Sequence, residues 1–279
     1  MRRVIRSFFV LTAAFGALAP ASVLAETVGK TNPNSGTVSV SAAAGPIVTS
    51  GSGSGVRCTW KALKRGDVVG IGATGTALTP EEAAEPATRI LDGREHRLYS
   101  VTCPTSGTDL RYIPTDIGVG ELIPGITDQV SRQLQLPVPS ISPTPAANGI
   151  VNLGMWLAVE PQVLDPLTAQ AGPAVWITVT PTLATTTFDL GNGDSITCDG
   201  TGVPIENVYP DLDVVEQSPT CGYTYRTSSP DDAPYRLTIT TTWRLPYESS
   251  EGAGEIPPLE RSVTVDYDVD EVPTVGVRG

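Results

Sequence analysis

Residues 70–75 have the sequence GIGATG, which matches the G-x-G-x-x-G fingerprint of dinucleotide-binding folds. In those folds a helix opens within the motif, and its N-terminal amides hold the pyrophosphate. Here the first helix start lies later, at Thr79, and it would bring Glu81 and Glu82 to the phosphate end. The sequence therefore predicts a mobile glycine-rich loop and no bound nucleotide.

His96 is the single histidine, so a Ser-His-Asp or Cys-His enzyme would have to use it. It lies in the charged segment 94–97 with no nucleophile elbow nearby, which favours a solvated side chain. A carboxylate pair about 5 to 10 Å apart could hydrolyse a glycoside, but no apolar context marks a particular pair. We therefore predict a protein that is not an enzyme and has no catalytic residues, with an envelope carbohydrate-active hydrolase as the alternative.

Five aspartates are weak candidates for Ca²⁺ binding, because hard cations take carboxylate oxygens. Asp266, Asp268 and Asp270 alternate along the last predicted strand, about 7 Å apart, and Asp189 and Asp194 flank a predicted turn. A straight strand does not converge its side chains on one ion. The favoured interpretation is an edge strand whose charges prevent edge-to-edge pairing, so no metal ion and no other cofactor is expected.

Charge and composition exclude several classes of protein. The 279 residues include 18 Lys and Arg against 30 Asp and Glu, a net charge of −12. A nucleic-acid binder or a polybasic membrane-surface protein needs a positive footprint, so neither class fits. The 28 Gly and 25 Pro imply many turns, while 40% hydrophobic residues suffice for a core. An all-helical bundle is excluded, and the expected fold class is mainly β.

The N-terminus has the pattern of an exported protein. Residues 1–25 combine a basic start, an apolar run over 8–18 and small residues before Glu26, which predicts a signal peptide. Residues 26–56 are rich in Ser, Gly, Ala and Thr and predict a disordered leader. Cleavage would leave 15 basic against 30 acidic residues, a charge of −15, and no stable membrane span. The expected location is secreted, or associated with the cell surface and envelope.

Four cysteines in an exported chain predict two disulfides, for which three pairings are possible. We favour Cys58 with Cys103 and Cys198 with Cys221, because each pair lies within one compositional block. The proline-rich stretch 137–145 separates the two blocks. A metal site made of the four thiolates is disfavoured, since no C-x-x-C spacing occurs.

Residues 57–115 are predicted to form a small disulfide-linked β module, followed by a helix and a proline-rich linker over 116–145. Alternating residues mark three half-buried strands in the module: Cys58 and Trp60; Tyr99, Val101 and Cys103; Leu110 and Tyr112. Leu122, Ile126, Val130 and Leu134 recur every four residues, the spacing of one helical face. Pro124 and its following glycine predict a helix start near Ile126, and 137–145 predicts an extended spacer between domains.

Residues 146–279 predict a β-sandwich, because several strands have apolar inner faces and Thr-rich outer faces. The inner-face residues of the two clearest strands are Tyr235, Leu237, Ile239, Thr241 and Trp243, then Val263, Val265, Tyr267 and Val269. Asn192 with Gly193 predicts a hairpin turn. Trp176 is a large group among the threonines that could contact a partner or simply cover a neighbouring loop.

Three motifs of this block occur in a fixed order: a strand leading into a Gly-rich turn, a Tyr-Thr-Tyr, and an alternating strand. Their residues are Phe188, Leu190, Gly191, Asn192, Gly193, Tyr223, Tyr225 and Tyr235. The set resembles the PKD-like domain, whose pattern is Trp/Phe-x-Phe/Leu-Gly-Asp-Gly, His-x-Tyr and Tyr-x-Val-x-Leu-x-Val. It is similar in particular to exported actinobacterial PKD-domain proteins, which carry cysteines where Cys198 and Cys221 stand. The chain departs from the pattern with Asn192 for Asp, with Tyr223 for His, and with Ala233 and Pro234 where a Gly usually precedes the Tyr.

This resemblance implies a C-terminal PKD/Ig-like β-sandwich that serves as a spacer or protein-interaction module at the cell envelope. A further alternative is an accessory component of a pilus or secretion machine. The expected partner is another envelope or extracellular protein, because a charge of −15 repels anionic wall polymers and attracts a basic protein surface.

Overall fold

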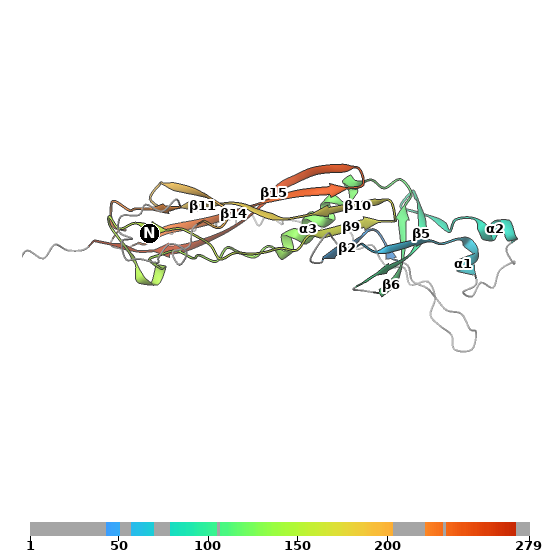
Figure 1. Cartoon of the computed structure of the whole chain (residues 1–279), viewed down its shortest axis with the longest axis horizontal. Coiled ribbons are helices and arrows are strands. Elements are labelled where there is room, and N and C mark those ends of the chain that lie inside the picture. Colours follow the sequence, from blue (N-terminus) through green and yellow to red (C-terminus); the bar gives the residue numbers. More distant parts are fainter. Residues whose placement is uncertain are drawn as a thin grey trace, which may run out of the picture.

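The computed structural model describes residues 43–50, 57–69, 79–104, 107–202, 221–230 and 233–271 of the 279-residue chain. These residues form an elongated, mainly β molecule (Figure 1). The predicted signal peptide, the GIGATG loop and residues 26–42 and 51–56 of the predicted leader lie outside the described residues.

A seven-stranded sheet forms the long body of the molecule. Its strands, in spatial order, are β12 (Ser195–Asp199), β11 (Thr182–Asp189), β14 (Tyr235–Ser249), β10 (Val175–Val179), β9 (Leu167–Ala171) and β2 (Ile47–Ser50), with β15 (Gly252–Tyr267) also paired to β14. Two short pairs accompany it: β8 (Met155–Trp156) with β13 (Gly222–Tyr223), and β7 (Gly149–Ile150) with β16 (Val269–Asp270). The helical turns near this sheet are η1 (Val119–Glu121), α3 (Ile123–Gln133) and η2 (Pro145–Ala147).

A second sheet of five strands lies at the other end of the molecule (Figure 1). It contains β1 (Ala43–Ala44), β6 (Gly107–Pro114), β5 (Arg94–Cys103) and β3 (Thr59–Ala62) in that order, with β4 (Thr88–Leu91) also paired to β5. The short helices α1 (Arg65–Val69) and α2 (Pro80–Ala84) extend from it. The expected helix start at Thr79 is confirmed, since Thr79 and Glu82 form a reciprocal capping box and the Thr79 backbone hydrogen bond lowers the pKa of Glu82.

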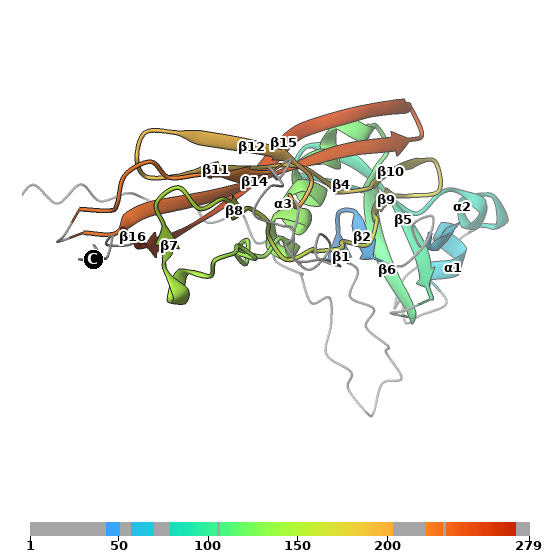
Figure 2. The same ribbon diagram turned by 60° about the vertical axis from the view of Figure 1, so that its left-hand side comes forward.

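The antiparallel hairpin of β14 and β15 is the longest element of the fold. It is paired from Tyr235 and Tyr267 at one end to Ser249 and Gly252 at the other, with one irregularity after Trp243. The first half of β14 also pairs with β11, and its last three residues pair with β10. One continuous hairpin therefore supports both ends of the large sheet (Figure 2).

Two hydrophobic cores lie along this hairpin. The helix-side core joins one face of α3 to β9, β10 and the far half of the hairpin; its fully buried members include Ile126, Val130, Leu167, Ile177, Val179 and Leu245. The turn-side core joins β11 and the first half of β14 to the short strands opposite; its fully buried members include Phe188, Leu190, Leu157, Leu237, Ile239 and Tyr267. This second core, enclosed between two β layers, confirms the sandwich-like architecture. Burying one such side chain stabilises the fold by about 1.5 to 3 kcal/mol.

The helix α3 uses the predicted face but begins earlier than predicted. Leu122, Ile126, Val130 and Leu134 are all at most 6% exposed and belong to the helix-side core. The helix starts at Ile123, three residues before the predicted start, because Pro124 occupies the first turn, where its missing N–H has no intrahelical acceptor to lose.

The proline-rich segment packs on the sandwich, which differs from the free spacer that we predicted. Ser140 and Ser142 donate their backbone N–H groups to the carbonyls of Ala158 and Trp156, at 2.9 and 3.1 Å. Ile141 between them is 4% exposed and lies in the turn-side core. The prolines lie in an edge segment of the chain. Because no further strand among the described residues pairs with that edge, the backbone N–H groups that prolines lack are not needed there as hydrogen-bond donors. This segment and α3 are thus part of the packed body.

The part of the predicted leader that the structure describes is ordered, which corrects the prediction for residues 43–50. Ala43–Ala44 pairs in parallel with β6, and Ile47–Ser50 pairs with β9. Gly45, at φ +103°, allows the turn between these two strands. The side chain of Ile47 packs on the cluster formed by Val101 and the first disulfide, which gives this segment an apolar anchor.

Both predicted disulfides are confirmed. Cys58 pairs with Cys103 and links β3 to β5, while Cys198 pairs with Cys221 and links β12 to the segment before β13. All four cysteines are at most 7% exposed. Among the described residues, no helix combines the length and the apolar character needed to cross a membrane.

Candidate functional site

The residues of the three motifs come together at one end of the sandwich. Phe188 and Leu190 are fully buried where β11 enters the turn, and the Leu190 N–H donates to the Asp194 carbonyl at 2.9 Å. Gly191 and Gly193 take positive φ values of +75° and +98°. The predicted hairpin of β11 and β12 is therefore confirmed, but the two glycines take the left-handed conformation, and Asn192 between them does not.

Gly191 is required by a close approach as well as by its backbone conformation. A Cβ placed on it would lie 2.6 Å from the Arg236 backbone nitrogen at the start of β14. A Cβ on Gly193 would meet no atom within 4 Å. The first glycine of the turn thus allows the turn to contact the neighbouring strand.

A cluster of tyrosines stands beside this turn. The Tyr225 ring stacks on Tyr235 at a centroid distance of 4.9 Å and lies 6.0 Å from Tyr267, while Tyr223 meets it edge-on at 4.9 Å. The Tyr225 hydroxyl donates to the Leu190 carbonyl at 2.9 Å. Burial raises the pKa of Tyr225 far above its usual value and that of Tyr267 to about 12, so both phenols stay neutral donors at physiological pH.

Two of the positions at which the chain departs from the PKD pattern, Asn192 and Tyr223, are hydrogen-bonded to each other. Asn192 donates its amide to the Tyr223 hydroxyl at 2.8 Å, and this hydroxyl donates to the Asp194 carboxylate. Burial first, and then the bond to Asp194, raise the pKa of Tyr223. The network joins the turn to β13.

The five calcium candidates do not converge. Asp189 accepts from the Gly191 N–H at 3.1 Å, and Asp194 is engaged as described. Asp266 forms an ion pair of 3.4 Å with Arg236, and Asp270 accepts from Asn148 at 3.0 Å. Asp268 lies between β15 and β16. Across the described ranges, no three His, Cys, Asp or Glu residues are grouped so that they could hold a metal ion.

His96 is buried, at 7% exposed, which corrects the solvated side chain that we predicted. Its Nδ1 lies 3.0 Å from the Arg94 carbonyl oxygen. The charged groups nearby are paired with one another: the Arg94 guanidinium forms ion pairs with Asp116 and Glu121. Its hydrogen bonds hold the pKa of both carboxyls below their usual values. The imidazole is thus a packed side chain of β5 with one local backbone contact.

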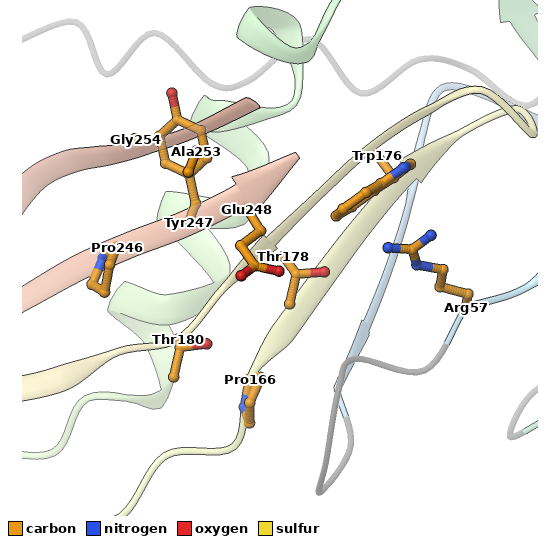
Figure 3. Close-up of a pocket in the computed structure, with 10 residues that line it drawn as sticks. All are labelled: Arg57, Pro166, Trp176, Thr178, Thr180, Pro246, Tyr247, Glu248, Ala253 and Gly254. Atoms are coloured by element: carbon orange, nitrogen blue, oxygen red, sulfur yellow. The ribbon is translucent and has the colours of Figure 1, made fainter. Parts of the chain in front are cut away.

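A groove of about 900 Å³ lies on the outer face of the large sheet, next to the helix-side core (Figure 3). It is lined by Arg57, Pro166, Trp176, Thr178, Thr180, Pro246, Tyr247, Glu248, Ala253 and Gly254. The Arg57 guanidinium stacks over the Trp176 ring, 3.7 Å from its centroid. In Figure 3 the Tyr247 side chain is turned to the other side of the sheet from Glu248. Trp176 and its threonine neighbours thus meet two charged groups from distant parts of the chain.

Sequence reasoning singled out Trp176 in this groove and missed Arg57 and Glu248. These two residues are 191 positions apart, and nothing in their local sequence distinguishes them from other surface charges. Both line the groove because β10 lies between β9 and β14 in the sheet, Glu248 belongs to β14, and the N–H of Cys58, the residue after Arg57, donates to the Gln170 side chain of β9. Alternation along β10 places Trp176, Thr178 and Thr180 on the same face, and that part was predictable.

A smaller pocket of about 270 Å³ lies where the proline-rich segment meets β14. Its lining includes Leu136, Val138, Glu160, Val163 and Trp243. Each of the two pockets is lined by a single carboxylate among the described residues, Glu248 in one and Glu160 in the other. Neither presents the two carboxylates that glycoside hydrolysis uses.

Comparisons of the chain with protein-family models, with curated proteins and with solved structures found no match.

Proposed function

We propose that the chain is an exported, non-enzymatic protein of the cell envelope, whose sandwich-like body acts as a rigid spacer and protein-interaction module. The observation that carries this proposal is the single β14–β15 hairpin running through both hydrophobic cores. Fourteen residue steps separate Tyr235 from Ser249, which gives the hairpin a length of about 45 Å. The ladder has one irregularity, after Trp243, and a larger bend between the cores would have to break further pairs.

The packing of the connecting segments supports the same proposal. A flexible spacer needs a linker with few contacts, whereas the proline-rich segment here is hydrogen-bonded to residues 156–160. The helix α3 also reaches the hairpin, because Arg261 of β15 donates to the Ser131 carbonyl and hydroxyl. The proposed spacer is therefore a stiff rod.

Export and the PKD-like assignment are parts of the proposal. The two disulfides fit an oxidising compartment, as is typical of extracellular proteins. The motif residues that carry the PKD resemblance gather at one turn, which is what a shared local structure requires. The proposed partner is another envelope or extracellular protein with a basic surface, since the chain carries a net charge of −12.

Two alternatives make different demands on the molecule. A carbohydrate-active hydrolase needs a carboxylate pair in a cleft, and each described pocket offers one carboxylate. An accessory role in a pilus or secretion machine would require stable association with the other parts of that machine.

The test combines processing, partner capture and an activity assay. Mass spectrometry of the protein recovered from outside the cell should give a first residue at Glu26 and both disulfides. A photo-crosslinker at Asn192, at the turn end, should then capture an envelope protein, and the capture should weaken as salt rises. Retention of the protein in the cytoplasm would contradict export. Release of reducing sugar from wall polysaccharide, lost in Glu248→Gln or Glu160→Gln, would contradict the non-enzymatic proposal.

A further inference from the structure

Two charged groups in the groove have unused hydrogen-bonding capacity. The Arg57 guanidinium carbon lies over the Trp176 ring, a cation–π contact that uses the positive charge and none of the five N–H donors. No carboxylate accepts from Arg57, and no donor reaches the Glu248 carboxylate, within the part of the chain that the structure describes. The groove thus presents a donor held against an aromatic ring and an acceptor on the other side, whose charges cancel.

The floor between them is a row of three side chains, of which two, Thr178 and Thr180, carry hydroxyls. Thr178 is hydrogen-bonded through its hydroxyl, at 2.9 Å, to the hydroxyl of Thr168, which is fully buried. Thr180 follows on the same face, about 7 Å further along the strand. With Trp176 at the other end, the row is about 13 Å long, and each hydroxyl can donate or accept.

We propose that this groove binds a neutral oligosaccharide. A sugar hydroxyl both donates and accepts, so neighbouring hydroxyls of one ligand can donate to Glu248 and accept from Arg57. The volume of about 900 Å³ lies within the range of about 300 to 1,000 Å³ that ligand pockets occupy. The ligand is neutral because the two groove charges balance and because a protein of net charge −12 repels acidic glycans.

A polypeptide fits this surface less well. The floor is the face of a sheet, where backbone groups of β10 and β14 are already paired with each other. An extended peptide lying on it would leave most of its own N–H and C=O groups without protein partners. A polyproline helix needs several aromatic side chains, and the described lining contains two, Trp176 and Tyr247, of which Tyr247 is turned to the other side of the sheet from Glu248.

The inference goes beyond the proposed function and is independent of it. A stiff rod that contacts a protein at its turn end can carry a glycan near its middle, and each property is measured separately. With one carboxylate in the lining, the groove retains its ligand without hydrolysing it.

The test is calorimetric titration of the full chain with neutral hexasaccharides of β-1,4-glucose, β-1,4-N-acetylglucosamine and α-1,6-mannose. At least one should bind saturably. Glu248→Gln and Arg57→Gln should each weaken that binding by about tenfold or more, since each removes a hydrogen bond to a charged group. Glu260→Gln and Arg236→Gln, matched exposed substitutions outside the groove, should leave it unchanged. Melting temperatures of all four variants check that each is folded.

Three results would overturn the inference. The first is no binding of any neutral hexasaccharide at millimolar concentration. The second is equal weakening by the groove substitutions and by the controls. The third is preferential binding of hexagalacturonate, which would show an anion site, or of a decaproline peptide, which would show a peptide site.

Discussion

Replacing Ile126 with alanine should destabilise the whole body, because α3 and the large sheet share one core. Ile126 is fully buried among residues of β9, β10 and the hairpin. The substitution removes three carbon atoms, worth about 2.4 kcal/mol of transfer free energy, and leaves a cavity that adds to this cost. Because alanine has a higher helix propensity than isoleucine, the substitution also stabilises the helix by a few tenths of a kcal/mol, which offsets a small part of this loss. We expect a loss of about 3 kcal/mol in the free energy of unfolding.

The matched control is Ile90→Ala, since Ile90 is 65% exposed on the edge strand β4. It should cost less than about 1 kcal/mol. Urea unfolding followed both by far-ultraviolet circular dichroism and by tryptophan fluorescence measures the two variants, and the two signals should change together. Equal costs for the two variants, or a helix that melts while the strands persist, would refute the shared core.

Three further outcomes follow from the geometry. Replacing both Cys198 and Cys221 with serine should lower the free energy of unfolding by about 3 kcal/mol, because the disulfide closes a loop of 23 residues; an unchanged urea midpoint would contradict this. Gly191→Ala should lower the free energy of unfolding by at least about 1 kcal/mol more than Gly193→Ala in the same assay. Both glycines have positive φ, but only at Gly191 would the new Cβ clash with backbone atoms, those of Arg236. Equal losses for the two variants would contradict this prediction. Burial raises the pKa of Tyr267 to about 12, which favours the neutral phenol in the folded state, so its contribution to the free energy of unfolding is complete below about pH 10 and is lost as the pH rises toward 12. Tyr267→Phe should therefore reduce the fall of the free energy of unfolding over this range by up to about 1.4 kcal/mol per pH unit. An unchanged dependence of the free energy of unfolding on pH would contradict the raised pKa.

Local patterns in the sequence predicted the strands and the disulfides well. The alternation from Tyr235 to Trp243 appears as an inner face that is buried at Leu237 and Ile239. The cysteine pairing followed from the compositional blocks and is the pairing observed. The strand pattern depends on neighbours in sequence, and the cysteine pairing follows the composition of each block, which is why a single chain was enough to predict both.

Features that depend on distant contacts were not predictable. The prolines around Ser140 and Ser142 predict an extended chain. They do not show whether that chain is free or hydrogen-bonded, because its partners are residues 156–160, which lie further along the sequence. His96 lies in a charged segment and is still buried, because β5 is covered on one face. The groove is the clearest case, since Arg57 and Glu248 approach it from opposite ends of the chain.

The distance between the two ends of the hairpin tests the rigid rod most directly. Spin labels carried by unnatural amino acids at Arg236 in β14 and at Ser250, the residue after β14, both exposed, would be 14 residue steps apart along the chain, about 45 Å. Pulsed electron paramagnetic resonance on the full chain should give one narrow distribution near that distance. A broad or two-peaked distribution would show that the molecule bends between its cores, and would contradict the proposed spacer.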